Sequence, residues 1–427
     1  MHHSRTNVLW LTICTLRADH LGTYGYKHPV SPTIDALARR GVLFEQALAA
    51  APWTRPSMAA AMTGLYPRSL NIDEPTEQTN NRQLHDSFRT LAEALHDHGY
   101  YTIGITANPN LNTVFNFDQG YDHYVDTGDF FWRSGYGERK RTAEQVNADL
   151  LQHLQGPSRG NKFFAHLTYV DVHAPLLDEA VAGRFRRLDR ALRAESTASY
   201  DRQVRYVDAA IADLLQGIRA LGHEDTLVII TSDHGEGFGQ YHPEDQGHGR
   251  TLYNSTIWVP FILSHPALER VARRHCARVE LTCLMPTVLD LLGIEYDPPA
   301  KQGKSLKQMI YGPSVESPFP FSVVETWFQD VGRSALIWSE WKLIAPHPEA
   351  AEGGRGPSDA EYELYQFRAD PEETTNLAAS RPYLVRRMEN MMTAWQRTHP
   401  PLVDGEELRV EVGVQTIEDL KALGYIR

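Results

Sequence analysis

The chain has 427 residues, with 54 acidic and 42 basic side chains and a formal net charge of −12. Hydrophobic residues make up 42% and charged residues 22%, which is typical of a folded globular protein and excludes global disorder. The negative balance disfavours a nucleic-acid binder, because phosphate backbones are bound mainly by lysine and arginine. Three cysteines are too few for a disulfide framework and favour a reducing compartment.

The first apolar run, residues 7–15, is short and is broken by threonines, so it predicts a buried strand and not a signal peptide. No stretch approaches the roughly 18 apolar residues that span a membrane. We therefore expect a cytoplasmic protein with neither a membrane nor a nucleic-acid partner. Homo-oligomerisation is left open.

Strand-like and helix-like segments alternate along the first 300 residues. The predicted strands cover 7–15, 44–51, 101–106, 162–169, 226–231 and 259–263. The predicted helices cover 33–41, 57–63, 91–98, 199–217 and 281–292. This alternation is typical of an α/β fold with a doubly wound, mostly parallel sheet flanked by helices.

The chain divides near a segment rich in Pro, Gly and Ser, residues 296–320. We predict a main domain over 1–315 and a small C-terminal α+β subdomain over 316–427. The subdomain should hold a small antiparallel sheet and a helix over 382–397. An Arg-rich stretch, 178–198, is expected to form a surface excursion.

Residues that can bind a metal or take part in catalysis follow several predicted strands. In parallel sheets, functional residues gather at the edge formed by the carboxyl ends of the strands. Cys14 ends the first strand, Asp233 and His234 follow strand 226–231, and thiolate, carboxylate and imidazole groups are all metal ligands. Thr54 lies in a proline-containing turn at a helix start, where an anion is stabilised. Two plainer interpretations stay open: Cys14 as a buried hydrophobe and Thr54 as an N-cap. His173 and His248, taken alone, are weaker candidates.

Several segments, in order, resemble the sulfatase family of the alkaline phosphatase superfamily. They are 7–26, 31–38, 51–67, 232–236, 247–253, 363–377 and 420–426. The resemblance covers nearly the whole chain and implies an alkaline-phosphatase-like fold and a metal-dependent ester hydrolase. It is much less specific for the substrate.

Three positions depart from the family pattern. Sulfatases place Cys or Ser where this chain has Thr54 and oxidise it to formylglycine, and they place Arg where it has Met58. We expect no formylglycine here. A hydroxyl nucleophile would leave a sulfate ester with no easy release, whereas the phosphoryl analogue can be hydrolysed. Thr54 therefore favours phosphate or phosphonate esters, as in a phosphodiesterase or phosphonate monoester hydrolase or transferase.

The third departure is Cys14, which stands where the family has a metal-binding Asp. Cys14, Thr54, Asp233 and His234 would form a mixed site for one divalent ion, and its thiolate favours Zn²⁺ over Mn²⁺ or Ca²⁺. The alternative is that losing this Asp, together with Met58, marks a degenerate site.

The resemblance also suggests roles around a small anionic ester. Thr54 would be the nucleophile, His173 would hold the anionic group, and His248 would protonate the leaving alcohol. Further substrate contacts are expected from Asn108, Arg17 and Arg55. A catalytically degenerate pseudoenzyme or binding module is the alternative hypothesis, and a true sulfate-ester hydrolase ranks third. We expect substrate specificity to be set by the loops 68–85, 108–140 and 176–198. Their sequences contain no motif that identifies the substrate.

Overall fold

The structure is a computed structural model. It describes residues 1, 5–73, 82–127, 141–176, 192, 196–271, 273–296, 302–312, 316–329, 331–347, 362–423 and 425. Most of the predicted excursion over 178–198, and parts of the three predicted specificity loops and of segment 296–320, lie outside these residues. Within them, no helix combines the length and apolar character needed to cross a membrane.

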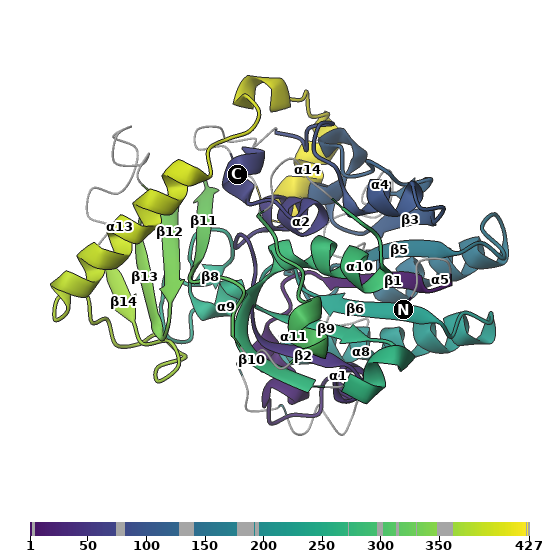
Figure 1. Ribbon diagram of the computed structural model, residues 1–427, viewed down its shortest axis with the longest axis horizontal. Helices are drawn as coiled ribbons and strands as arrows, with labels where there is room; N and C mark the ends of the chain where they lie inside the picture. The colour runs from purple at the N-terminus through teal and green to yellow at the C-terminus, as the bar shows by residue number, and fades with distance from the viewer. Residues whose placement is uncertain are drawn as a thin grey trace.

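An eight-stranded sheet forms the centre of the main domain (Figure 1), with strand order β10-β2-β9-β6-β1-β5-β3-β4. The strands are β1 (Asn7–Ile13), β2 (Val42–Leu48), β3 (Tyr101–Thr106), β4 (His123–Val125), β5 (Phe163–Tyr169), β6 (Thr226–Thr231), β9 (Trp258–Ser264) and β10 (Arg273–Glu280). Only β9 runs antiparallel to its neighbours, β2 and β6. The predicted α/β fold with a mostly parallel sheet is confirmed.

Helices cover both faces of this sheet. One face carries α1 (Pro32–Arg40), α5 (Ala143–Gln155) and α8 (Ala198–Ala220). The other carries α2 (Thr54–Thr63), α4 (Leu91–His96), α10 (Leu284–Leu292) and α11 (Lys307–Tyr311). Because side chains alternate along a strand, β1 sends Val8 and Trp10 into one core and Leu9 and Leu11 into the other. This two-sided burial explains the continuous apolar runs in the sequence.

The C-terminal region forms a four-stranded antiparallel sheet, as predicted. Its strands are β11 (Ser322–Phe328), β12 (Val331–Trp338), β13 (Trp341–Pro346) and β14 (Glu363–Tyr365). Helix α13 (Pro382–Thr398) packs across β12 and β13, on the left of Figure 1, and buries Met388 and Met392 against that sheet. The boundary between 1–315 and 316–427 stays a prediction.

Several elements, including one edge strand and two helices, were not predicted. Strand β10 has the charged sequence RRHCARVE, because it is an edge strand with exposed arginines and a register irregularity, so it lacks an apolar run. Helix α5 follows a capping box between Thr142 and Gln145, a signal that the sequence did contain. Helix α14 (Val414–Ala422) returns from the C-terminal sheet to the main domain, where it packs on the 3₁₀ helix η3 (Pro109–Leu111).

Helix α2 starts earlier than predicted. Its first residue is Thr54, not Ser57, and Trp53 occupies the N-cap position with extended backbone angles. This shift places the Thr54 hydroxyl at the helix N-terminus, directly over the strand ends.

Candidate active site

Four adjacent strands end at the same edge of the main sheet. They are β6, β1, β5 and β3, which are neighbours in that order, and all four run parallel. Cys14 directly follows β1. Ser232 directly follows β6, and Asp233 and His234 come next in the chain. His173 and Asn108 lie just beyond β5 and β3. Parallel topology therefore brings residues from four distant parts of the sequence together.

The hydroxyl of Thr54 lies at the centre of this group and is completely buried. Its Oγ1 donates to Asp233 Oδ2 at 2.7 Å and lies 3.3 Å from His234 Nε2. It makes no capping hydrogen bond to α2, because the N-cap residue is Trp53. The interpretation of Thr54 as an N-cap is therefore wrong, and its hydroxyl is committed to the cluster.

The carboxylate of Asp233 is fixed through both oxygens. Oδ1 accepts from the backbone N–H groups of Thr15 at 3.1 Å and His234 at 2.9 Å. Oδ2 accepts from Thr54 and from the Cys14 thiol, the latter at 3.1 Å. In addition, Ser57 Oγ donates to the Asp233 carbonyl at 2.6 Å, which ties the first turn of α2 to the end of β6.

The imidazole of His234 is oriented by a backbone contact. Nδ1 lies 2.8 Å from the Gly235 carbonyl oxygen, so Nδ1 carries the proton and the Nε2 lone pair faces the cluster. Burial lowers the pKa of His234 and outweighs the opposing charge of Asp233, so the ring is neutral. A neutral imidazole with its lone pair directed at a carboxylate is the form that binds a metal.

Cys14 is completely buried, but its sulfur faces polar groups. Burial, reinforced by the Asp233 charge, raises the pKa of the Cys14 thiol well above its ordinary value. The thiol is therefore neutral and donates to Asp233, and metal binding would have to release this proton. The interpretation of Cys14 as a purely hydrophobic residue does not account for these contacts.

Cys14, Asp233 and His234 can each offer one ligand atom within 4.8 Å of the other two. The His234 lone pair lies 3.3 Å from Asp233 Oδ2, and two acceptors this close are best reconciled by a cation between them. Sulfur, nitrogen and oxygen donors in one buried site also match the ligands that Zn²⁺ takes in proteins. The residues therefore fit a divalent metal, and their assignment as ligands stays a prediction.

Two histidines form one wall of the cluster. The ring of His248 lies 4.5 Å from that of His234 and 4.9 Å from that of His173, between ring centroids. His248 Nδ1 is 3.2 Å from Glu236 Oε1, a contact that orients the imidazole ring. His173 Nδ1 contacts the carbonyl oxygen of Ala174. The structure thus brings both predicted histidines to the site.

Asn108 and an unpredicted residue, Tyr425, close the other side. The Asn108 Oδ1 atom accepts from the Asn110 N–H at 2.9 Å, which turns its amide nitrogen toward the cluster. That nitrogen lies 3.2 Å from Thr54 Oγ1 and 3.3 Å from Cys14 Sγ. The Tyr425 hydroxyl lies 2.8 Å from Thr54 Oγ1. The only sequence signal for Tyr425 was its place in the family-like segment 420–426.

The two predicted arginines, Arg17 and Arg55, are buried, and both contact groups outside the cluster. Arg17 forms a two-pronged ion pair with Asp19, at 2.9 and 2.7 Å. The Arg55 guanidinium lies 3.6 Å from the ring centroid of Phe115, and burial lowers its pKa to about 9. Neither side chain is a surface charge, because both are buried. Their role as anion contacts stays a prediction.

Met58, which stands where the family has an arginine, is 1% exposed and belongs to the main hydrophobic core. The position is therefore apolar in this protein, and α2 offers no cation there.

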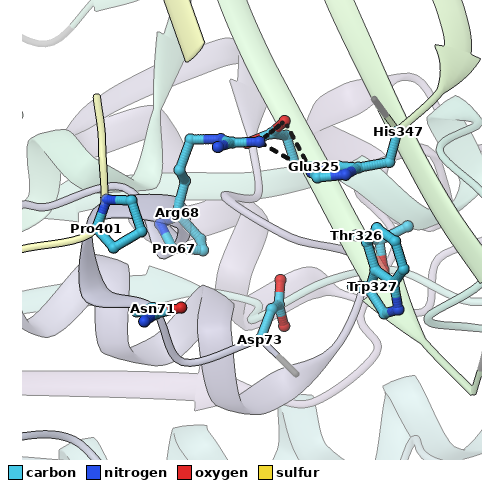
Figure 2. A pocket seen from close by; sticks show the side chains of 9 residues that line it. All are labelled: Pro67, Arg68, Asn71, Asp73, Glu325, Thr326, Trp327, His347 and Pro401. Atoms are coloured by element: carbon cyan, nitrogen blue, oxygen red, sulfur yellow. Dashed lines mark hydrogen bonds and ion pairs between the residues drawn. The ribbon is translucent and has the colours of Figure 1, made fainter. Parts of the chain in front are cut away.

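A separate polar pocket lies between the main domain and the C-terminal sheet. Figure 2 shows its lining, with the Arg68 and His347 side chains converging on Glu325. Arg68 Nε donates to Glu325 Oε2 at 2.8 Å, and His347 Nε2 lies 3.4 Å from Oε1. Burial alone would raise the pKa of Glu325, but the hydrogen bond from His347 and the Arg68 charge lower it to about 2. This carboxylate therefore links α3 (Pro67–Leu70) of the main domain to β11.

We expect Glu325→Gln to lower the free energy of unfolding at pH 7 by an amount on the order of 3 kcal/mol. The folded pKa lies below the ordinary value of 4.5, so the stabilisation is present above pH 4.5 and is lost as the pH falls toward 2. Urea unfolding of both proteins from pH 7 to pH 3 checks this. Glu389→Gln, on the outer helix α13, is the control. Equal pH dependence in wild type and Glu325→Gln would contradict the assignment.

Comparisons with known proteins agree with this architecture. The family model described as Sulfatase matches residues 6–294. A Delta 4,5-hexuronate-2-O-sulfatase of Bacteroides thetaiotaomicron is 22% identical, over 86% of this chain and 84% of that protein. Human N-sulphoglucosamine sulphohydrolase is 24% identical, over 90% of this chain and 88% of that protein.

Solved structures show the same fold. A 2-O GAG sulfatase superposes with a TM-score of 0.73 at 19% identity, covering 97% of this chain and 96% of the other. The phosphonate monoester hydrolase of Agrobacterium radiobacter gives 0.70 at 18% identity, with 92% and 96% covered. The family model spans well over half of the residues, which confirms the resemblance seen in the motifs. The chain belongs to the sulfatase family.

Proposed function

We propose that this sulfatase-family protein is a metal-dependent hydrolase or transferase of phosphate or phosphonate esters, with Thr54 as its nucleophile. The observation that carries the proposal is the 2.7 Å hydrogen bond from Thr54 Oγ1 to the fixed, buried carboxylate of Asp233. A hydroxyl next to a base is an activated nucleophile. Threonine also lacks the route to formylglycine on which the family's sulfate chemistry depends.

In the first step, Thr54 Oγ1 attacks the phosphorus atom and its proton passes to Asp233 Oδ2. The bond from phosphorus to the alcohol oxygen breaks, and His248 gives its proton to that oxygen as the alcohol leaves. Glu236 holds the His248 ring in position through the 3.2 Å contact. Water then attacks the phosphothreonine and gives a proton to His248, which restores the proton that His248 gave up. The bond from phosphorus to Thr54 Oγ1 breaks, and Asp233 returns its proton to Thr54 Oγ1. A second alcohol in place of water would make the reaction a transfer.

Cys14, Asp233, His234 and Thr54 would hold the metal ion. When bound, such an ion supplies charge that stabilises the anionic transition state and makes the Thr54 hydroxyl easier to deprotonate. Zn²⁺ is favoured over Mn²⁺ and Ca²⁺ because of the thiol. Asn108 can donate to a non-bridging oxygen from the nitrogen that now contacts Thr54, and His173 lines the same space.

The similar fold of a phosphonate monoester hydrolase supports an ester of phosphorus. The named sequence relatives are sulfatases, so a sulfate ester remains the contrasting substrate. A reducing, cytoplasmic setting belongs to the same proposal, since Cys14, Cys276 and Cys283 are all free thiols.

A second candidate is a catalytically degenerate binding module. Buried, apolar Met58 favours it, because the family's arginine has no replacement at this point of α2.

Substrate preference tests these alternatives. We expect the protein, loaded with Zn²⁺, to hydrolyse p-nitrophenyl phenylphosphonate or bis-p-nitrophenyl phosphate at least tenfold faster than p-nitrophenyl sulfate. The leaving group is the same, so the ratio reports on release from Thr54 and not on alcohol departure. Preferred cleavage of the sulfate would overturn the proposal. Turnover of none of the three esters, in protein without bound metal, would favour the binding module.

A further inference from the structure

The C-terminal arm of the chain reaches into the candidate active site. We define this arm as α14 (Val414–Ala422) with Leu423 and Tyr425. Figure 1 shows that it leaves the C-terminal sheet and crosses to the main domain, where α14 contacts η3. Tyr425, which follows α14, is 3% exposed.

The Tyr425 hydroxyl occupies the open side of the nucleophile. It is 2.8 Å from Thr54 Oγ1, 3.2 Å from Asn108 Nδ2 and 3.9 Å from Cys14 Sγ. Thr54 Oγ1 also contacts Asp233 and His234 in the floor of the site. Asn108 Nδ2 lies 3.2 Å and Cys14 Sγ 3.9 Å from the same oxygen. The phenol ring lies against the wall of histidines, with centroids 5.5 Å from His173 and 5.3 Å from His248.

A substrate cannot react with Thr54 while Tyr425 stays there. The attacked atom must approach the nucleophile to about 3–3.5 Å before the bond forms. The Tyr425 hydroxyl lies within that distance of Thr54 Oγ1, and Thr54, Asn108, Asp233 and His234 are each completely buried. Substrate and Tyr425 therefore exclude one another.

Few side chains of the C-terminal arm are buried. Within α14 only Asp419 and Leu420 are buried, and Val414 is 73% exposed. Leu420, Leu423 and Tyr425 are its buried contributions to the main core. Segments with few buried apolar contacts open without global unfolding.

We propose that the C-terminal arm is an autoinhibitory plug: Tyr425 closes the Thr54 site, and the arm must withdraw before an ester can enter. This rests on the proposed function only in naming an ester as the excluded ligand. The occlusion itself is a property of the site, and the test below measures it without turnover.

The three cysteines provide the measurement. Cys14 lies beneath Tyr425, Cys276 is exposed and Cys283 is buried elsewhere in the core. Wild type and Tyr425→Ala are treated with iodoacetamide, and alkylation of each cysteine is followed by peptide mass spectrometry. Cys276 calibrates the reagent and Cys283 reports unfolding. Tyr383→Ala, which removes an 81% exposed tyrosine from α13, is the matched control.

We expect Cys14 to be alkylated at least about tenfold faster in Tyr425→Ala, the change that follows if the arm is closed in nine-tenths of wild-type molecules. Cys276 and Cys283 should not change, and Tyr383→Ala should match wild type. If Cys14 stays as slow as Cys283 in Tyr425→Ala, the plug is overturned.

Tyr425→Phe keeps the ring and the fold but loses the hydroxyl, so a Cys14 rate at or above the wild-type rate is expected. A Cys14 rate lower than in wild type would contradict the hydroxyl contact as part of the closure.

Inorganic phosphate separates this inference from the proposed function. Isothermal titration should give at least about tenfold tighter phosphate binding to metal-loaded Tyr425→Ala than to wild type, because no arm has to be displaced. Faster Cys14 alkylation without phosphate binding would keep the plug and remove the anion site. Weaker phosphate binding in Tyr425→Ala would instead make Tyr425 part of the binding site and overturn the plug.

Discussion

Replacing Thr54 with valine is expected to lower kcat/KM for an aryl phosphonate monoester by at least about 10³-fold, since loss of a covalent nucleophile removes the reaction path itself. Valine keeps the shape of the side chain, so the change isolates the hydroxyl. The buried donors left without Thr54 Oγ1 should reduce stability by about 1–3 kcal/mol, which leaves a folded protein. Steady-state kinetics and thermal unfolding together measure the two effects.

Two variants sharpen this test. Thr54→Ser should retain partial activity, because the hydroxyl and its contact with Asp233 remain. Thr63→Val is the matched control: Thr63 is a buried threonine at the other end of α2, and its hydroxyl bonds to the Ala59 carbonyl. Its kcat/KM should stay within about twofold of wild type, since the site is not touched. Unchanged activity in Thr54→Val would mean that water attacks the ester directly.

The central part of the site could be predicted from sequence because the parallel strand topology brings most of its residues together. Apolar runs such as 226–231 identified strands buried on both faces, and parallel strands place their carboxyl ends at one edge. Cys14, Asn108 and Asp233 follow such strands directly, so knowing the strands was enough to group them. Whether a residue lies at the end of a strand depends on the nearby sequence, so a local pattern can predict it.

Tyr425 could not be found in this way. It is separated from Thr54 by 371 residues and reaches the site through α14, whose position depends on how the C-terminal sheet docks. The sequence likewise did not show that Asp19 would form an ion pair with the Arg17 guanidinium. The role of Arg17 as an anion contact stays a prediction. The strand β10 was missed for a related reason, because an edge strand carries its polar residues outward. Such features depend on partners, which a local pattern does not specify.

Cys14 decides which metal the site prefers, and Cys14→Asp is expected to change that preference by at least about tenfold. A thiolate favours Zn²⁺, whereas a carboxylate in its place would make an oxygen-rich site that suits harder ions such as Mn²⁺ or Ca²⁺. The dissociation constants for Zn²⁺ and Mn²⁺ are measured by competition titration. The Mn²⁺ constant divided by the Zn²⁺ constant should be larger in wild type than in Cys14→Asp. The measurement needs no turnover, so it applies to an enzyme and to a binding module alike.

The matched control is Cys276→Asp, which introduces the same group at an exposed position on β10, far along the sheet order from β1. Its metal preference should equal that of wild type. The carboxylate in Cys14→Asp would lie beside Asp233, which the thiol now contacts at 3.1 Å. Two carboxylates this close repel unless a cation is bound between them, so metal should stabilise Cys14→Asp more than wild type in thermal unfolding. If both proteins bind the two ions with the same ratio, Cys14 is not a ligand, and Asp233, His234 and Thr54 would have to hold the ion without it.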